Sequence, residues 1–173
     1  MFATLYLPNF SLQAAMRHQP ALSRQPVALI EEQENRPVVI QLNEAAASVG
    51  IEKGMTPSQA LARCLQVVIR VRERAQEKLI DDILLQHAFM LSPFVEATAP
   101  GICTIQFTDN RNLTAKLARV VEKLAQCEIT AQAGVAPRPD TSLIAAHVAR
   151  PICEVNEAKE FLAPLAIETL ALA

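Results

Sequence analysis

The hydrophobic positions along the chain fall into short strand-like runs and longer stretches with helical spacing. An apolar run at 2–7 (FATLYL) predicts a buried strand, and the stretch at 9–18 (NFSLQAAMRH) predicts a helix with Asn9 as its N-cap. The two meet at Leu7 and Pro8, at a strand end, where many enzymes keep a catalytic carboxylate. The sequence therefore raises the question of whether this turn is purely structural or a site that has lost its chemistry.

The middle of the chain carries a smaller set of alternating elements. The predicted elements are a strand at 26–32, a strand at 37–42, a short helix at 43–50, a helix at 56–64 and a strand at 66–72. The polar QEN between the first two strands predicts a hairpin. Thr56 is the expected N-cap of the second helix, Pro57 takes its first position, and Gly50 is expected to end the first helix.

The rest of the chain contains the longest helical pattern and a second set of strands. The predicted elements are a helix at 73–91, strands at 93–98 and 101–108, a helix at 112–127, a strand at 128–136 and a helix at 139–151. Pro100 and Gly101 predict the turn between the two strands, and Asp140 or Thr141 is expected to open the last helix. Together these patterns predict an α+β fold with a smaller subdomain inserted after the first helix.

Composition narrows the function classes. The chain has 173 residues, of which 51% are apolar, so it can bury a substantial core. The net charge of -2 gives no general attraction to nucleic acid, so any DNA contact would have to be local. No apolar run is long enough to cross a bilayer, and Met1 leads into the first strand without a basic segment. We therefore expect a cytoplasmic protein with no signal peptide and no membrane contact.

The residues that most often bind zinc are scattered along the chain. They are Cys64, Cys103, Cys127, Cys153, His18, His87 and His147. Zinc sites usually contain closely spaced ligand pairs, and none is present in this set. We therefore expect no metal at these residues, and the cysteines are expected to be reduced.

Three stretches resemble the N-terminal half of the Y-family (translesion) DNA polymerases. They are FATLYLPNFSLQAA, RQPVALI…NRPVVIQLNEAAASVGIEKGMTPSQALARC and ITAQAGVAPRPDTSLIAAHVARP. The residues on matching positions are Gly50, Gly54, Met55, Gly134, Ala145, Ala149 and Pro151. Each match alone is weak, but their order along nearly the whole chain is specific.

The resemblance implies a ferredoxin-like palm sheet with packed helices and a small inserted fingers subdomain. The palm would comprise 1–19 and 76–173, and the fingers 20–75. The C-terminal stretch KEFLAPLAIETLALA is apolar and helix-like and has no cap, so we expect the chain to be a fragment that runs toward a missing thumb.

The positions at which this family holds its catalytic metals carry no acid here. Two-metal nucleotidyl transfer needs clustered carboxylates. The matching position on the first strand is Leu7, and the acidic pair of the later hairpin matches Pro100-Gly101 or Gly101-Ile102. Leu12 stands where the family has the aromatic residue that screens the sugar 2′-hydroxyl.

The positions that would hold the nucleotide triphosphate are also changed. The Tyr and Arg of the fingers motif match Glu44 and Ala47, and the palm Lys matches Leu143. Arg138 and Arg150 remain possible DNA contacts, and a basic run comprises Arg70, Arg72, Arg74 and Lys78. A solvent-exposed face is the alternative for each of these cations.

Other carboxylates are candidates to replace the missing acids. Glu96 and Asp109 flank the predicted strand pair, and a surface role is the alternative for both. The same alternative holds for an acidic cluster on the fingers hairpin, which comprises Glu31, Glu32 and Glu34. Asp81 and Asp82 are adjacent on the long helix, where their side chains diverge by about 100° and cannot both chelate one ion.

This pattern resembles the ImuB-like branch of the family, whose members act without catalysis in damage-induced translesion synthesis and mutagenesis. The resemblance implies an adaptor that meets damaged DNA and, through segments outside this chain, a sliding clamp and a replicative-type polymerase. No cofactor is expected. Two alternatives stay open: an active, divergent nucleotidyltransferase that uses Mg²⁺ and displaced carboxylates, or an unrelated α+β binding domain.

Overall fold

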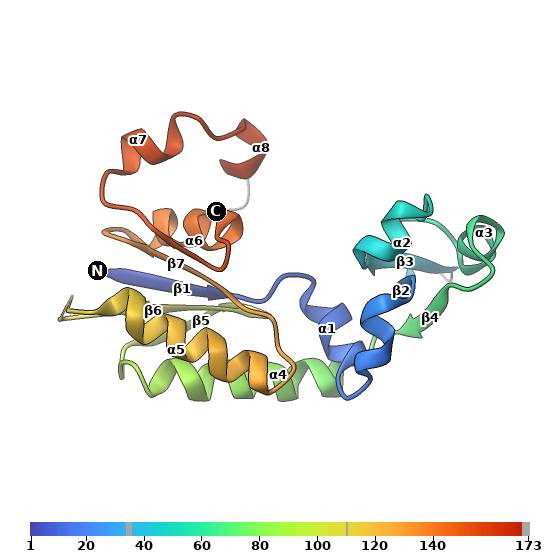
Figure 1. Ribbon diagram of the computed structural model, residues 1–173, viewed down its shortest axis with the longest axis horizontal. Coiled ribbons are helices and arrows are strands. Elements are labelled where there is room, and N and C mark those ends of the chain that lie inside the picture. Colours follow the sequence, from blue (N-terminus) through green and yellow to red (C-terminus); the bar gives the residue numbers. More distant parts are fainter. Residues whose placement is uncertain (34–35, 110, 171–173) are drawn as a thin grey trace. The chain divides into compact units, whose positions relative to one another are not determined.

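The chain forms two compact units, each with its own sheet (Figure 1). The computed structural model describes residues 1–33, 36–109 and 111–170. The larger unit comprises Met1–Pro8 and Ile80–Ala173, and the smaller unit comprises Asn9–Leu79. The sequence predicted boundaries after residues 19 and 75, whereas in the structure α1 (Phe10–Met16) groups with the smaller unit.

The larger unit contains a sheet with the strand order β5-β6-β1-β7-β8. Its strands are β1 (Phe2–Tyr6), β5 (Val95–Ala99), β6 (Ile102–Gln106), β7 (Gln132–Ala136) and β8 (Ile152–Glu154). β1 is the central strand and pairs antiparallel with β6 on one side and with β7 on the other. Its three middle residues are buried because strands flank it and helices cover both faces of the sheet, whereas Phe2 and Tyr6 at its ends are half-buried.

Helices cover the two faces of this sheet (Figure 1). α5 (Leu113–Gln126) and the part of α4 (Arg74–Phe89) that begins at Ile80 lie on one face, and α6 (Pro139–Val148) lies on the other. α5 buries a stripe with helical spacing, formed by Leu113, Leu117, Val120 and Leu124. α6 approaches β7 very closely, because a Cβ atom added at Gly134 would lie 2.2 Å from the carbonyl oxygen of Ser142. Only glycine fits this position of the sheet.

The smaller unit is built on a three-stranded sheet with the order β3-β2-β4. The strands are β2 (Val27–Gln33), β3 (Arg36–Leu42) and β4 (Val68–Val71), and the helices beside α1 are η1 (Pro20–Arg24), α2 (Glu44–Ser48) and α3 (Pro57–Arg63). Ala28 and Val39 pack with Ala46 of α2 and Ala60 of α3 in one apolar cluster. A second cluster, from the other face of β2, contains Leu12, Leu22, Val27 and Leu29.

The fold class predicted from the sequence is confirmed, and so are most of its elements. The 26–32 and 37–42 hairpin and the 66–72 strand appear as β2, β3 and β4. Thr56 caps α3 through a capping box with Gln59, as its position predicted. The C-terminal stretch contains α7 (Ala158–Leu162) and α8 (Ile167–Leu170).

Several local predictions were wrong. Asn9 is the N-cap residue of α1, as predicted, but its backbone is left-handed with a φ of 49° and its side chain makes no cap bond. α6 begins at Pro139 with Arg138 as its N-cap, whereas Asp140 or Thr141 was expected to open it. η1 and the three-residue strand β8 were not predicted. Within the part of the chain that the structure describes, no helix is long and apolar enough to span a membrane.

An ion-pair cluster holds the smaller unit together at the end of β4. Arg72 donates to Glu77 at 2.7 Å and to Glu31 at 3.0 Å, and it thereby joins β2 to the start of α4. Glu77 is buried, and it also accepts a hydrogen bond from the Ser11 hydroxyl of α1. Burial alone would raise the pKa of Glu77, but the bonds from Arg72 and Ser11 outweigh it and lower that pKa.

We predict that Arg72→Ala destabilises the protein by about 1–3 kcal/mol at neutral pH, because it leaves a buried carboxylate without its main donor. Arg74→Ala is the matched control: its side chain is 79% exposed where it meets Glu31, so its loss should cost less than about 1 kcal/mol. Urea unfolding of the three proteins measures the difference. Equal losses for the two variants would show that Glu77 does not depend on Arg72.

The same cluster predicts a pH dependence of stability. Arg72 and Arg74 lower the pKa of Glu31, and the pKa of Glu77 is lowered as well. The cluster therefore stabilises the fold fully above the unfolded pKa of about 4.5, and this stabilisation is lost as the pH falls through the lower folded values. Below that pH the stability of Arg72→Ala should fall less steeply than that of the parent chain. Parallel curves of unfolding free energy against pH for the two proteins would show that this cluster does not cause the pH dependence.

Candidate functional site

The end of β1 and the turn between β5 and β6 meet at one edge of the larger unit's sheet. Tyr6 pairs with Ile102 in the register of β1 and β6, and the backbone N–H of Leu7 donates to the Gly101 carbonyl at 2.9 Å. The positions that the sequence analysis matched to the two acidic motifs of the polymerase family are therefore side by side. We call this place the strand-end junction; it comprises Leu7, Pro100, Gly101 and Ile102.

The side chains of the strand-end junction are apolar. Leu7 is 0% exposed, so it is part of the core, and Ile102 is half-buried. Gly101 has a φ of 75°, which the tight turn after Pro100 requires and which favours glycine. None of these four residues has a side-chain atom that ligates a hard cation.

A carboxylate does reach the junction, from α4. Asp81 Oδ1 accepts a hydrogen bond from the backbone N–H of Gly101 at 2.8 Å. Burial raises the pKa of the Cys103 thiol on β6 to about 12, and the negative charge of Asp81 adds to that rise. Asp81 therefore lies beside both the turn and the strand that follows it. The sequence analysis considered Asp81 only with Asp82 as a chelating pair and missed this contact.

The residues at the strand-end junction do not fit a two-metal site. Such a site needs several carboxylates around two cations about 3.5–4 Å apart. The junction offers Asp81, whose Oδ1 is already an acceptor for Gly101. Among residues 1–33, 36–109 and 111–170, no group of three or more His, Cys, Asp or Glu residues could hold a metal ion. No catalytic step through Mg²⁺ follows from this donor set.

The two candidate replacement acids lie away from the junction. Asp109 forms an exposed ion pair with Arg111, whose hydrogen bonds lower the pKa of that carboxyl. Glu96 pairs with Thr104 in the sheet, two residues along β6 from Ile102, which is about 7 Å of strand. Of the acidic cluster on the β2–β3 hairpin, Glu31 is bound to Arg72 and Arg74, and Glu34 lies outside the described residues.

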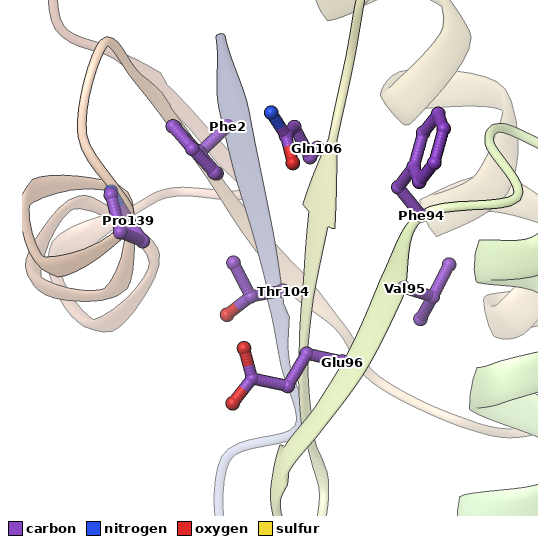
Figure 2. A pocket seen from close by; sticks show the side chains of 7 residues that line it. All are labelled: Phe2, Phe94, Val95, Glu96, Thr104, Gln106 and Pro139. Atoms are coloured by element: carbon purple, nitrogen blue, oxygen red, sulfur yellow. The ribbon is translucent and has the colours of Figure 1, made fainter.

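A hollow of about 290 Å³ opens at Glu96 (Figure 2). Its lining consists of Phe2, Phe94, Val95, Glu96, Thr104, Gln106 and Pro139. A chain of hydroxyl groups borders it, in which Thr104 contacts Thr98 at 2.8 Å and Thr4 at 3.4 Å. The hollow has one carboxylate among apolar and uncharged polar side chains, so its composition does not resemble a metal centre.

The α6 side of β1 carries an aromatic contact and the predicted DNA-contacting cations. The rings of Tyr6 and His147 lie 4.0 Å apart between centroids, and burial lowers the pKa of His147. Leu143, one turn before His147, is half-buried. Arg138 is paired with Asp140 at 3.3 Å, and Arg150 donates to the carbonyl of Ala149 at 2.8 Å. Both arginines are exposed.

The remaining matched positions belong to the smaller unit. Leu12 is buried against Leu22, Val27 and Leu29, so it has a packing role there. Glu44 and Ala47 are exposed on α2, whose first turn is capped by the Asn43 side chain. None of these three side chains supplies the positive charge that a triphosphate requires.

Solved structures identify the class of fold. DinB from Sulfolobus solfataricus matches with a TM-score of 0.82 and 17% identity, over 97% of this chain and 52% of that one. An insertion ternary complex of Dbh DNA polymerase matches with a TM-score of 0.84 and 15% identity, over 97% of this chain and 53% of that one. The two units therefore have the α+β palm-and-fingers fold of Y-family DNA polymerases.

The sequence itself gives the family. The model of the impB/mucB/samB family matches residues 5–147, and the chain belongs to that family. DNA polymerase IV of Actinobacillus pleuropneumoniae serotype 5b (strain L20) is 26% identical over 141 residues, which is 79% of this chain and 40% of that protein. DNA polymerase IV of Ralstonia nicotianae (strain ATCC BAA-1114 / GMI1000) is 26% identical over 166 residues, 90% of this chain and 46% of that protein. The chain thus spans less than half the length of these relatives.

We predict that Asp81→Ala loosens the β5–β6 turn and destabilises the protein by about 1–3 kcal/mol, because the Gly101 N–H loses its acceptor. Asp81→Asn keeps an acceptor oxygen without the charge, so its cost should be about half as large. Hydrogen exchange at Gly101 should accelerate in both variants, most in Asp81→Ala. Asp82→Ala, on the exposed side of α4, serves as the control and should stay within about 0.5 kcal/mol. Unchanged exchange at Gly101 in Asp81→Ala would refute the contact.

Proposed function

We propose that this chain is the palm-and-fingers part of a non-catalytic, ImuB-like Y-family homologue that acts as an adaptor in damage-induced translesion synthesis and mutagenesis. The observation that carries the proposal is the buried Leu7 at the strand-end junction. The bond from Leu7 to Gly101 supports it, because it joins the two segments that match the family's acidic motifs, and in that match Leu7 stands where the family has its first acid.

The contact of Asp81 with Gly101 supports the same conclusion. In a two-metal enzyme, several carboxylates near one another repel, and bound cations offset that repulsion. Here the turn is held by a hydrogen bond from Gly101 to a single carboxylate, so its geometry needs no cation. The junction is therefore stable as a structural element by itself.

The matched nucleotide-contacting positions point in the same direction. Glu44 would repel a triphosphate, and neither Ala47 nor Leu143 can donate a hydrogen bond to it from the side chain. A nucleotide that entered this framework would find neither the metal ligands nor the cationic clamp. We therefore expect no binding of Mg²⁺ or nucleotide at the palm, and no cofactor.

The proposed activity is to hold other components at damaged DNA. The full-length protein would contact damaged DNA, with Arg138 and Arg150 as exposed cations on this chain. A sliding clamp and a replicative-type polymerase would bind segments beyond this chain. We place the protein in the cytoplasm of its cell, as part of the SOS response to DNA damage.

An active, divergent nucleotidyltransferase is the alternative. It would have to use Glu96, which lines the hollow on the sheet about two residues from the junction. A single carboxylate at that distance does not form a pair with Asp81, which lies at the turn itself. An active enzyme would therefore require β5 to rearrange so that Glu96 reaches the junction, whereas the proposed adaptor requires no such rearrangement.

Primer extension tests the proposal on the full-length protein. With Mg²⁺ or Mn²⁺, a primed template and all four nucleotides, we expect no incorporation above that of a sample without protein. The reason is that metal-assisted phosphoryl transfer has no ligand set at the junction. A homologous polymerase with its acids intact serves as the positive control.

Two further variants make the result decisive. Glu96→Gln and Asp109→Asn should leave the negative result unchanged. Robust incorporation that Glu96→Gln abolishes would establish the divergent enzyme, and incorporation that survives both variants would place the active acids elsewhere. Either outcome would overturn the non-catalytic assignment.

A further inference from the structure

Arg70 of β4 and Arg72, which directly follows this strand, lie on the α1 side of the smaller unit, and their hydrogen-bond partners differ in charge. Val68 packs into the cluster with Leu12 and Leu22, so the alternation of a strand directs Arg70 and Arg72 to the same face. Arg72 has both Glu31 and Glu77 as partners. Arg70 has a neutral partner, since its Nη2 donates to Gln19 Oε1.

Three guanidinium nitrogen atoms of Arg17 and Arg70 lack an acceptor. Nε of Arg70 and both Nε and Nη1 of Arg17 are buried without a hydrogen-bond partner. Among the described residues, no other buried side-chain nitrogen or oxygen atom lacks a partner. Arg17 is the C-cap residue of α1. The backbone N–H of Gln19 donates to the Met16 carbonyl at 3.0 Å, so a tight turn connects Arg17 to Gln19, whose side chain binds Arg70.

A buried charged donor without an acceptor is costly, so these groups favour any acceptor that can reach them. The nearby carboxylates are already engaged, because Arg72 and Arg74 bind Glu31 and Arg72 binds Glu77. Arg17 and Arg70 are only half-buried, so rotation of their outer torsions opens the donors to solvent. Guanidinium groups donate in a planar fork that matches the oxygen spacing of phosphate.

We propose that Arg17 and Arg70, with the Gln19 side chain beside them, form a binding site for a phosphate oxyanion on the smaller unit. The site goes beyond the proposed function, because it depends neither on the loss of catalysis nor on the strand-end junction. The phosphate belongs either to the backbone of a nucleic-acid strand or to a free phosphate or pyrophosphate ion. Both sources present the same oxygen geometry to the two guanidinium groups.

Arginine side-chain NMR of the 173-residue chain tests the site directly. Titration with inorganic phosphate, pyrophosphate and a single-stranded oligonucleotide should shift the Nε–Hε resonances of Arg17 and Arg70, with saturation. The resonance of Arg63, an exposed arginine at the end of α3, should stay in place at the same ionic strength. If the resonances of Arg17 and Arg70 move no more than that of Arg63 with every probe, the proposal is wrong.

Variants separate the two sources of phosphate. If a nucleic-acid strand is the ligand, Arg17→Gln/Arg70→Gln should weaken oligonucleotide binding and reduce the slope of log K against log salt by roughly 1.4, since each single-strand phosphate contact contributes roughly 0.7. If the slope is unchanged while phosphate or pyrophosphate still shifts the resonances in the parent chain, the ligand is the free ion.

Two controls keep the test decisive. Arg63→Gln removes one charge from the same unit and should leave the affinity for the preferred probe within about twofold. Arg17→Lys/Arg70→Lys keeps both charges but loses the fork, so it should bind weakly as well. Full affinity in the lysine variant would show that the positive charge alone accounts for binding. A loss of affinity in Arg63→Gln equal to that in Arg17→Gln/Arg70→Gln would show the same, and either result would overturn the site. Circular dichroism and thermal midpoints verify that each variant is folded.

Discussion

The backbone hydrogen bond from Leu7 to Gly101 is the contact on which the larger unit depends. It extends the pairing of β1 with β6 by one step beyond Tyr6 and so fixes the end of the central strand against the β5–β6 turn. β7 pairs with the other side of β1, and α6 packs so closely on β7 that Gly134 has no room for a side chain. The positions of these strands and helices therefore follow from backbone pairing around β1.

Main-chain atoms alone make this contact between the end of β1 and the β5–β6 turn. The bond itself therefore does not depend on which side chain stands at position 7. Leu7 is wholly buried and adds to the core, where an ionised acid would be costly unless it were paired. Asp81 then holds the turn from the α4 side.

Local signals in the sequence predicted those parts of the fold that local interactions determine. The capping box of Thr56 and Gln59 and the polar turn between the two β-branched runs each act within a few residues, so α3 and the β2–β3 hairpin could be predicted. β8 has three residues and exists through its parallel pairing with β7, so no pattern of its own marks it. Arg138 was not expected as the N-cap of α6, because arginine is not among the residue types that favour this position, and its side chain makes no cap bond here.

The candidate site was predictable only as far as the resemblance located its segments. The matches at Leu7 and at 100–102 named two turns, and the register of β1 and β6 brings them together. The contact of Asp81 with Gly101 and the bonds of Arg72 to Glu31 and Glu77 join residues far apart in sequence, and no spacing rule predicts such pairs. The orphaned donors of Arg17 and Arg70 are likewise a property of tertiary structure, since they depend on which acids Arg72 and Arg74 already bind.

The central claim is that the strand-end junction holds no divalent cation, and paramagnetic relaxation by Mn²⁺ tests it most directly. The amide resonances of Leu7, Gly101 and Ile102 can be followed while Mn²⁺ is added, with and without a nucleoside triphosphate. The account predicts that these three amides broaden no more than exposed amides elsewhere in the chain. Selective broadening of Leu7 and Gly101 at low Mn²⁺, reversed by excess Mg²⁺, would show that the junction binds metal and would contradict the account.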